Sequence, residues 1–352
     1  MATVAIIGAG MMGTAMCWPL VDRGHEVRLV GTPLDEEWIR SIRECRVHPR
    51  LEREIPEGVK EYFVDQLPEA VEGIDLIIGG VSSFGVDWFA KTVGPYLKPD
   101  VPVLSVTKGM EDQPDGSLQI LPEVLNSRIP DNLRGKISFN AIGGPCIAFE
   151  LAARRHTAIV FTGKDMNILR QMRDLLATDY YHIYLSTDFV GVEVCAALKN
   201  AYAMGVGMAV GMMEAAGPDG LAHMYNPQAG LFAQSTYEMR KLLRVLGGGE
   251  ENAAWLPGSG DLYVTVFGGR TVRLGKLLGQ GTPFVEARKI LAGVTLESVE
   301  ITTRVARALP KLAQRGLVNL DDFPLMLHLD RIINHGEPVN IPWDKFFQSP
   351  YL

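Results

Sequence analysis

The sequence is poor in the features that mark several classes of protein. Its 352 residues include only four cysteines, at positions 17, 45, 146 and 195, and no two have the Cys-x-x-Cys spacing of a metal site. We therefore expect neither a metal site nor a disulfide framework. The chain has no positive excess, since 34 lysines and arginines face 41 aspartates and glutamates for a net charge of −7. Non-specific nucleic-acid binding needs a basic surface, so we expect no nucleic-acid partner.

Long hydrophobic runs are also missing. The longest charge-free apolar stretch in the middle of the chain covers residues 200–213, short of the ~20 residues that span a bilayer. The N-terminal MATVAIIGAGMMG has no basic segment ahead of its apolar residues, unlike a secretory signal. With 47% apolar and 21% charged residues, the balance is that of a globular protein. We expect a soluble, cytoplasmic protein of about two domains.

In the first half of the chain, short runs of β-branched residues alternate with stretches of helical apolar spacing. Residues 14–23 and 87–97 are examples of the helical kind. This alternation predicts an α/β domain on a mostly parallel, Rossmann-like sheet. The expected strands are Val4–Ile7, Val27–Val30, Leu76–Ile78, Val101–Val106, Ile137–Ile142 and Ala158–Phe161.

Helical periodicity takes over near Asp188, and no convincing strand follows residue 187. Joints rich in glycine and proline, such as GPDG at 217–220, separate the helical stretches. We therefore expect an all-helical second domain, with the boundary placing residues 1–187 in one domain and residues 188–352 in the other. The main helical stretches are 190–213, 227–246, 283–291 and 296–313.

A glycine-rich motif follows the first predicted strand directly. In Gly8-Ala-Gly10-Met-Met-Gly13, the first glycine suits a tight turn and the second lets a pyrophosphate approach the backbone. Gly13 lets the next helix pack against the strand. That helix offers the N–H groups of its first turn to phosphates. We interpret the motif as a dinucleotide-binding loop.

The residues after the second predicted strand leave NAD and NADP open. Dinucleotide-binding domains often place Asp or Glu here to hold the ribose, but this chain has Gly31 and Thr32. Acids come only at residues 35–37, where they would equally suit a helix start. No arginine stands at residues 31–34 to receive a 2′-phosphate. We expect NAD, with NADP as the alternative.

Lys199 and Asn200 lie within an apolar stretch, where a solvated lysine is out of place. Burial would lower the pKa of Lys199 towards the working pH, which suits a general acid or base. A structural ion pair with Glu193 is the alternative.

Two further segments carry charged groups among glycines or at a strand end. The segment 258–271 contains Asp261, Thr265 and Arg270, which fit an anion clamp or a plain loop salt bridge. Lys108 follows a predicted strand, at the carboxyl end where ligands bind in open α/β sheets. A lysine of a surface loop is the alternative.

Together these motifs resemble NAD(P)-dependent glycerol-3-phosphate dehydrogenase, and GTPLD and HPRL look most like its archaeal members. The likeness runs from Val4 to about residue 310. The order and spacing of the motifs are more specific than any single one. They are GAGMMGTA at 8–15, VSSF at 81–84, TKG at 107–109, GGPCIAFELA at 143–152, DFVGVEVCAALKNAYA at 188–203, GSGDLYVT at 258–265, GGR at 268–270 and LGQG at 278–281.

The resemblance implies reversible hydride transfer between NAD(P)H and dihydroxyacetone phosphate. Lys199 matches the lysine that protonates the carbonyl oxygen, Lys108 matches a second lysine of the substrate site, and Asp261 would keep Lys199 charged and oriented. Other residues match positions that bind substrate or cofactor. The substrate set is Asn200, Thr265, Arg270 and Thr271; the cofactor set is Gly8, Gly10, Met11, Met12, Gly13, Phe84, Ala148, Arg270 and Glu297.

The resemblance also implies the roles of the two domains. Residues 1–187 would bind the dinucleotide, and residues 188–352 would hold the substrate and the catalytic groups. It further implies a homodimer that works in glycerophospholipid metabolism.

Four positions depart from the family pattern. Thr271 replaces an asparagine, Gln234 an arginine, Ser298 a glycine, and Gly143 a serine or threonine. The changes at Thr271 and Gln234 are expected to touch the anion-binding side. They leave open an alternative function, that of a sister dehydrogenase acting on a different small ketone, polyol or sugar phosphate.

Overall fold

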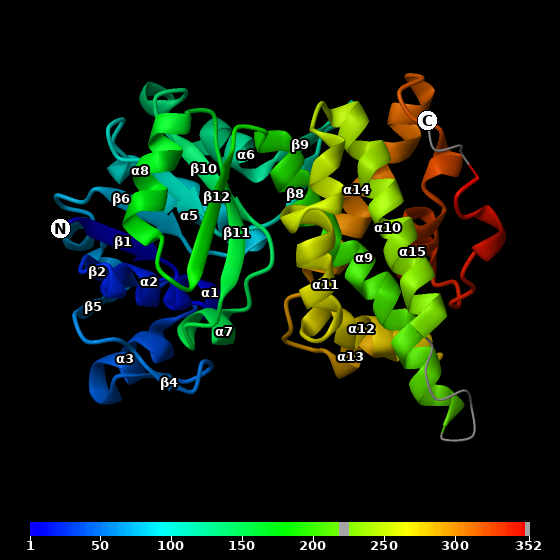
Figure 1. The fold of residues 1–352 in the computed structure, drawn as a ribbon, viewed down its shortest axis with the longest axis horizontal. Helices are drawn as coiled ribbons and strands as arrows, with labels where there is room; N and C mark the ends of the chain where they lie inside the picture. The colour runs from blue at the N-terminus through cyan, green and yellow to red at the C-terminus, as the bar shows by residue number, and fades with distance from the viewer. Residues whose placement is uncertain (218–224, 349–352) are drawn as a thin grey trace. The chain divides into compact units, whose positions relative to one another are not determined.

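The computed structural model describes residues 1–217 and 225–348, and the chain forms two compact units (Figure 1). Unit 1 consists of Met1–Lys108 and Leu121–Phe189, and unit 2 of Gly109–Ile120 and Val190–Leu352. The short segment 109–120 therefore belongs to unit 2, whereas the sequence placed it in the first domain. Most of the predicted joint at 217–220 lies outside the described residues.

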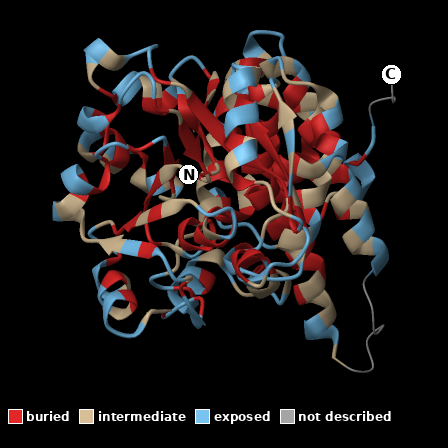
Figure 2. Ribbon diagram, turned by 60° about the vertical axis from the view of Figure 1, so that its left-hand side comes forward, coloured by how far each residue is buried: buried red, intermediate tan, exposed pale blue. Residues whose placement is uncertain are grey.

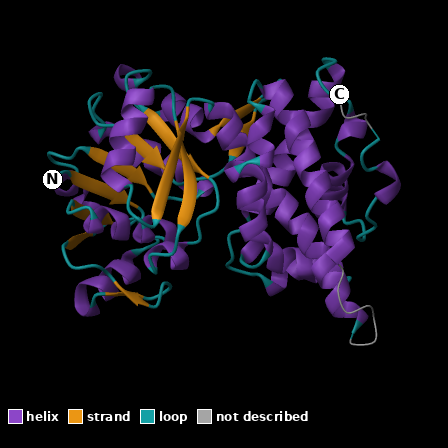
Figure 3. Cartoon of the chain, viewed as in Figure 1, coloured by secondary structure: helices purple, strands orange, loops and turns teal. Residues whose placement is uncertain are grey.

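An eight-stranded sheet forms the centre of unit 1 (Figure 3). Neighbouring strands are parallel except at one pair, β10 and β11, so the predicted mostly parallel sheet is confirmed. The two edge strands, β5 and β12, were not predicted, because their mixed polar sequences lack a continuous apolar run. The order is β12 (Tyr181–Ser186), β11 (Thr157–Thr162), β10 (Phe139–Gly143), β7 (Val103–Ser105), β6 (Leu76–Gly79), β1 (Thr3–Ile7), β2 (Glu26–Val30) and β5 (Val59–Tyr62).

Helices cover both faces of this sheet, and the side chains of β1 show why. Val4 and Ile6 pack in one apolar cluster, while Ala5 and Ile7 pack in the other, as the two-residue period of a strand requires. Figure 2 shows that much of the sheet is buried. The helices are α1 (Met11–Ala15), α2 (Cys17–Asp22), α3 (Glu36–Cys45), α4 (Leu67–Ala70), α5 (Val86–Thr92), α6 (Leu121–Arg128), α7 (Ala148–Ala152) and α8 (Met166–Leu176), with a small hairpin of β3 (Val47–His48) and β4 (Arg53–Glu54).

Unit 2 is helical apart from one hairpin, and within the described residues no strand follows β12. The hairpin joins this unit because α14 binds it: Arg304 donates to the Met110 carbonyl at 2.6 Å, and Arg307 pairs with Asp112 at 2.7 Å. The elements are β8 (Met110–Asp112), β9 (Leu118–Ile120), α9 (Phe189–Ala216), α10 (Tyr225–Leu246), α11 (Asp261–Val266), α12 (Arg270–Gly279), α13 (Phe284–Ile290), α14 (Glu297–Gln314) and α15 (Pro324–His335).

Helix α9 is the central helix of unit 2. By length and apolarity it would pass as a membrane span, yet 94% of its most apolar window is buried inside the protein, as in a core helix. Its backbone runs close to α12 at four glycines, Gly207 and Gly211 on α9 and Gly275 and Gly279 on α12. A Cβ on Gly207 would lie 3.2 Å from the Val272 carbonyl oxygen, and a Cβ on Gly275 would collide with the Met204 carbonyl oxygen. This close packing fixes the position of α12 against α9 along most of its length.

Candidate active site

The glycine loop of unit 1 is tightly folded against the turn after β6. Gly8 has φ +112°, and a Cβ on it would lie 2.8 Å from the backbone of Gly80. A Cβ on Gly13 would collide with the carbonyl oxygen of Gly8. At Gly10 the nearest atom to a Cβ would be 3.8 Å away, so this face is open. The loop thus has the shape that a pyrophosphate needs, close-packed behind and open in front.

The other predicted cofactor residues of unit 1 lie on elements next to this loop. Met11 and Met12 begin α1, and Met12 Sδ lies 3.9 Å from Cys146 Sγ in the segment before α7. Ala148 is buried at the start of α7. Phe84 lies four residues after Gly80, and 57% of its surface is exposed.

Asp35, the first acid after β2, bonds to the protein itself. Its Oδ2 accepts hydrogen bonds from Ala9 N at 3.1 Å, Thr32 N at 2.9 Å and Thr32 Oγ1 at 2.8 Å. It also makes no side-chain cap on α3. The carboxylate is therefore engaged inside the protein, and it supplies no argument for NAD over NADP.

In unit 2, three predicted residues come together around an ammonium group. Lys199 on α9 donates to Asp261 Oδ1 at 2.8 Å and to Thr265 Oγ1 at 2.9 Å, both on α11. Thr265 in turn donates to the Asp261 carbonyl oxygen at 2.6 Å, which turns its lone pairs towards Lys199. The ion pair is buried, with side chains 10% and 2% exposed. Lys199 thus pairs with Asp261, while Glu193, the partner weighed from the sequence, is buried in the same helix.

A π-helical turn, Leu256–Gly260, delivers Asp261 to this position. Such turns are rare and frequently occur at functional sites. Asn200, the next residue on α9, is also buried.

A second group of predicted residues gathers where two helices begin. Arg270 opens α12 and Glu297 opens α14, with Arg270 Nη2 4.0 Å from Glu297 Oε2. Thr271 is buried in the first turn of α12, and no side chain caps that turn. The start of a ten-residue helix next to a half-exposed arginine can hold an anion.

Lys108 ends the first segment of unit 1 and follows β7. Its ammonium donates to the Gly144 carbonyl oxygen at 3.3 Å, and the neighbouring Thr107 hydroxyl donates to the Val81 carbonyl at 2.7 Å. These bonds join the turns that follow three neighbouring strands, β6, β7 and β10. Lys108 therefore occupies the carboxyl edge of the sheet, as the sequence predicted.

Two of the four departures lie in the core of unit 2, and the placement of Gln234 on the anion side stays a prediction. Gln234 and Ser298 have no exposed surface. Gln234 Nε2 donates to Glu238 at 2.9 Å, while its Oε1 accepts from Phe347 N in the C-terminal tail at 3.3 Å. An arginine could make only the first bond, because it has no acceptor. The bond to the C-terminal tail therefore explains why a glutamine suits this position.

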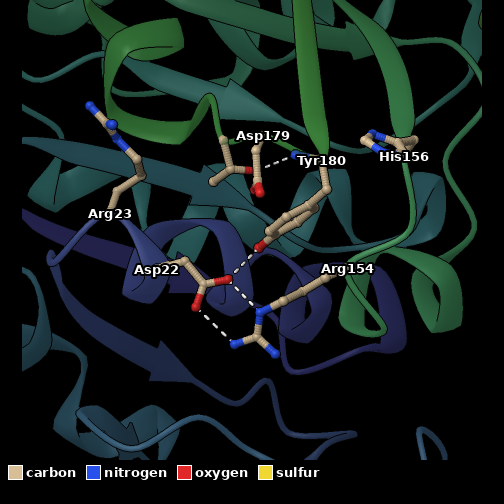
Figure 4. A pocket seen from close by; sticks show the side chains of 7 residues that line it. Asp22, Arg23, Arg154, His156, Asp179 and Tyr180 are labelled. Carbon is tan, nitrogen blue, oxygen red and sulfur yellow. Dashed lines mark hydrogen bonds and ion pairs between the residues drawn. The ribbon is translucent and has the colours of Figure 1, made fainter.

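Unit 1 also contains a pocket of about 430 Å³ that none of the predicted site residues lines (Figure 4). Three of its lining side chains, Asp22, Arg154 and Tyr180, bond to one another. Asp22 accepts two bonds from Arg154, at 2.7 and 2.8 Å, and one from the Tyr180 hydroxyl at 2.6 Å. The Arg154 guanidinium holds the pKa of Asp22 below its usual value. The lining residues are Asp22, Arg23, Arg154, His156, Thr178, Asp179 and Tyr180.

Family models match both halves of the chain. The N-terminal model of NAD-dependent glycerol-3-phosphate dehydrogenase matches residues 3–169, and the C-terminal model matches residues 188–343. The NADP(+)-dependent glycerol-3-phosphate dehydrogenase of Archaeoglobus fulgidus is 37% identical over 82% of this chain and 83% of its own length. The glycerol-3-phosphate dehydrogenase [NAD(P)+] of Symbiobacterium thermophilum is 32% identical over 99% of this chain and 94% of its own length.

Solved structures of glycerol-3-phosphate dehydrogenases are also similar to this chain. Glycerol-3-phosphate dehydrogenase from Coxiella burnetii matches with a TM-score of 0.80 at 26% identity, covering 96% of both chains. The Plasmodium falciparum enzyme of that name has a TM-score of 0.82 at 17% identity, covering 100% of this chain and 96% of its own, which shows a shared fold.

Proposed function

Since this chain belongs to the NAD-dependent glycerol-3-phosphate dehydrogenase family, we propose that it transfers hydride reversibly between NAD(P)H and dihydroxyacetone phosphate. It is an oxidoreductase that acts on a CH–OH group. The observation that carries the proposal is the buried ion pair of Lys199 and Asp261, with Thr265 as the second acceptor. A buried lysine held by two acceptors is a costly arrangement that suits a positioned proton donor.

We assign the proton step to Lys199. When bound, the cofactor supplies or accepts the hydride at the substrate carbon. The Nζ of Lys199 donates a proton to the carbonyl oxygen as that carbon is reduced, and takes it back in the reverse reaction. Asp261 stabilises the ammonium form, and Thr265 fixes its direction. In a site largely screened from water, this charge acts strongly on the developing alkoxide.

The glycine loop would hold the pyrophosphate of the cofactor through the open side at Gly10. Gly8 and Gly13 allow the close packing behind it, and Phe84 and Met11 offer apolar surface. Because Asp35 is engaged inside the protein, we propose that both NAD and NADP are accepted. Arg270 and the first turn of α12 would bind the substrate phosphate, with Glu297 orienting the guanidinium. From the family resemblance we also propose Lys108 as a lysine of the substrate site.

The experiment that tests the function is oxidation of NADH and of NADPH by the purified protein. Dihydroxyacetone phosphate and unphosphorylated dihydroxyacetone are compared as substrates. We expect turnover with the phosphate ester alone. A protein that binds the cofactor but leaves the ester untouched would contradict the proposal.

The phosphate site has a matched control on the same helix. Arg270→Leu removes the proposed phosphate ligand, whereas Arg273→Leu removes an exposed arginine one turn further along α12. We expect KM for the ester to rise about 10–100-fold in the first variant and to stay unchanged in the second, because a charged hydrogen bond is worth about 1.5–3 kcal/mol. Equal KM values in both variants would place the anion elsewhere.

A second candidate function rests on Thr271 alone. With Gln234 and Ser298 in the core, it is the departure next to Arg270. A threonine reaches less far than an asparagine, which would leave room for a different sugar phosphate or small ketone. A substrate screen in which another phosphorylated ketone exceeds dihydroxyacetone phosphate in kcat/KM would favour this reading. We further propose a cytoplasmic homodimer, as the family resemblance implies, and light scattering of the purified protein tests the dimer.

A further inference from the structure

Ala9 sits between two glycines in the middle of the loop, and side chains hold its backbone on both sides. Its N–H donates to Asp35 Oδ2 at 3.1 Å, and its carbonyl oxygen lies 2.8 Å from His48 Nε2. Both side chains are buried, His48 completely. Asp35 directly precedes α3 and His48 belongs to β3, so two later segments of the chain return to the loop.

The hydrogen bonds of His48 determine where its proton sits. Its Nδ1 accepts from the backbone N–H groups of Arg50 at 3.2 Å and Leu51 at 3.1 Å. Nδ1 therefore carries no proton, and the neutral ring is protonated at Nε2, which donates to the Ala9 carbonyl. The Trp38 ring packs beside it at 5.3 Å. The site accepts one tautomer of the neutral imidazole.

Holding the Ala9 carbonyl also orients the next donor along the chain. Within one planar peptide group the C=O and N–H bonds point in opposite directions, so an Ala9 carbonyl turned to His48 turns the Gly10 N–H away from it. The peptide group is followed by Gly10, whose backbone rotates freely, and the Thr14 hydroxyl shares the task of holding it by donating to the same Ala9 carbonyl at 3.1 Å. Ordering it in advance reduces the entropy that binding must overcome.

We propose that Asp35 and His48 are positioning residues for the cofactor, which hold the two peptide groups of Ala9 so that the N–H groups from Gly10 onward face the pyrophosphate. The inference rests on the proposed function, because it takes the glycine loop as the cofactor site. Neither side chain was singled out in the sequence as a partner of the loop. The HPRL segment that contains His48 resembles archaeal members of the family, but its sequence does not indicate a bond to the loop.

The test compares two substitutions that each keep one half of the imidazole. His48→Gln places an amide N–H near the position of Nε2 and can still bond the Ala9 carbonyl. His48→Asn places an amide oxygen near Nδ1 and serves Arg50 and Leu51, but it does not reach Ala9. By NADH fluorescence titration we expect Kd within about threefold of wild type for the glutamine variant and about tenfold higher for the asparagine variant.

His328→Asn is the matched control. His328 is a buried histidine of unit 2 whose Nε2 accepts from Asn340 N at 3.2 Å, so the same substitution removes a comparable bond far along the chain. We expect its melting temperature to fall and its NADH affinity to stay that of wild type. Unchanged NADH affinity in His48→Asn would overturn the inference. A wild-type protein that binds neither NADH nor NADPH would instead overturn the proposed cofactor site.

A pH titration gives a readout that a purely structural histidine would not move. Burial lowers the pKa of His48; the charged groups facing the ring are Arg50, which lowers it further, and Asp35, which opposes this. A proton on Nδ1 would face two N–H donors and break the arrangement. We expect the wild-type Kd for NADH to rise as pH falls from about 7.5 to about 5, and the His48→Gln variant to lack this rise. Parallel curves would overturn the inference even if His48→Asn failed to fold.

Discussion

The two units build their candidate sites in opposite ways. In unit 1, the loop Gly8–Gly13 is a run of consecutive residues whose shape follows from where side chains are missing. In unit 2, Lys199 and Asp261 are 62 positions apart and come from different helices. The first site is a local arrangement of backbone, while the second is an arrangement of side chains that exists only after the helices have packed.

This difference has an energetic side. On the open side of the loop, water can bond the backbone N–H groups. Leaving them without a protein partner therefore costs little free energy of folding. The ion pair of unit 2 has lost its water, and removing one member of a buried pair costs about 3–5 kcal/mol. The loop should therefore lose function without unfolding, whereas unit 2 should suffer in both respects unless the charge is kept.

The largest effect is expected at Lys199. Lys199→Arg keeps the positive charge beside Asp261, but a guanidinium does not release a proton at working pH. We expect kcat to fall about 10²–10⁴-fold, the contribution of general acid catalysis, with melting temperature and NADH affinity nearly unchanged. Lys199→Ala should lose stability as well, because it leaves Asp261 buried without its partner. A Lys199→Arg enzyme within tenfold of wild-type kcat would remove the proton-transfer role.

Two glycine substitutions separate shape from binding in unit 1. Gly10→Ala adds a methyl group on the open side of the loop, so we expect NADH affinity to fall about 100-fold while the melting temperature stays within about 2 °C. Gly13→Ala forces a methyl group into the Gly8 carbonyl and should cost about 1–3 kcal/mol of stability as well. Titration and thermal melts of both variants check the pair. If both variants lost only stability, the loop would not be the cofactor site.

A smaller loss of stability is expected on substituting Gln234. This residue tests whether a buried polar side chain of unit 2 can affect stability without affecting substrate binding. Gln234→Leu removes one donor to Glu238 and one acceptor for the C-terminal tail, so we expect about 1–3 kcal/mol of lost stability in urea unfolding. Burial raises the pKa of Glu238 to about 7, and the bond from Gln234 opposes that rise. KM for dihydroxyacetone phosphate should not change. A raised KM would return Gln234 to the substrate site.

The smallest effect is an acid-induced loss of stability at His328, the residue of α15 that bonds the backbone of Asn340. Burial lowers the pKa of His328 to about 4, below that of an unfolded histidine. The unfolded chain then binds the proton more readily, so stability is complete above about pH 6.5 and is lost as pH falls towards 4. We expect about 1–2 kcal/mol of loss at about pH 5. His328→Gln should remove this part of the pH dependence, and an unaltered profile would assign it to other groups.

The sequence predicted the parts of the fold that depend on local pattern. The six expected strands are all present, because strands buried on both faces read as continuous apolar runs. The edge strand β12, with its exposed His182 and Tyr184, has no such run and escaped prediction. The sequence placed the hairpin 110–120 in the first domain and gave no sign of its bonds to Arg304 and Arg307, nearly 200 positions away in unit 2.

The sequence alone therefore determined the α/β and helical halves, the glycine loop and the family. The loop is encoded in consecutive residues because a glycine excludes a side chain wherever it stands, whatever surrounds it. Only the tertiary structure decided that Asp35 faces Ala9 rather than a ribose, that His48 returns to the loop, and that Gln234 serves the tail. A polar side chain bonds whichever partner the fold brings within about 3 Å. Because such partners can lie anywhere along the chain, the sequence pattern does not predict them.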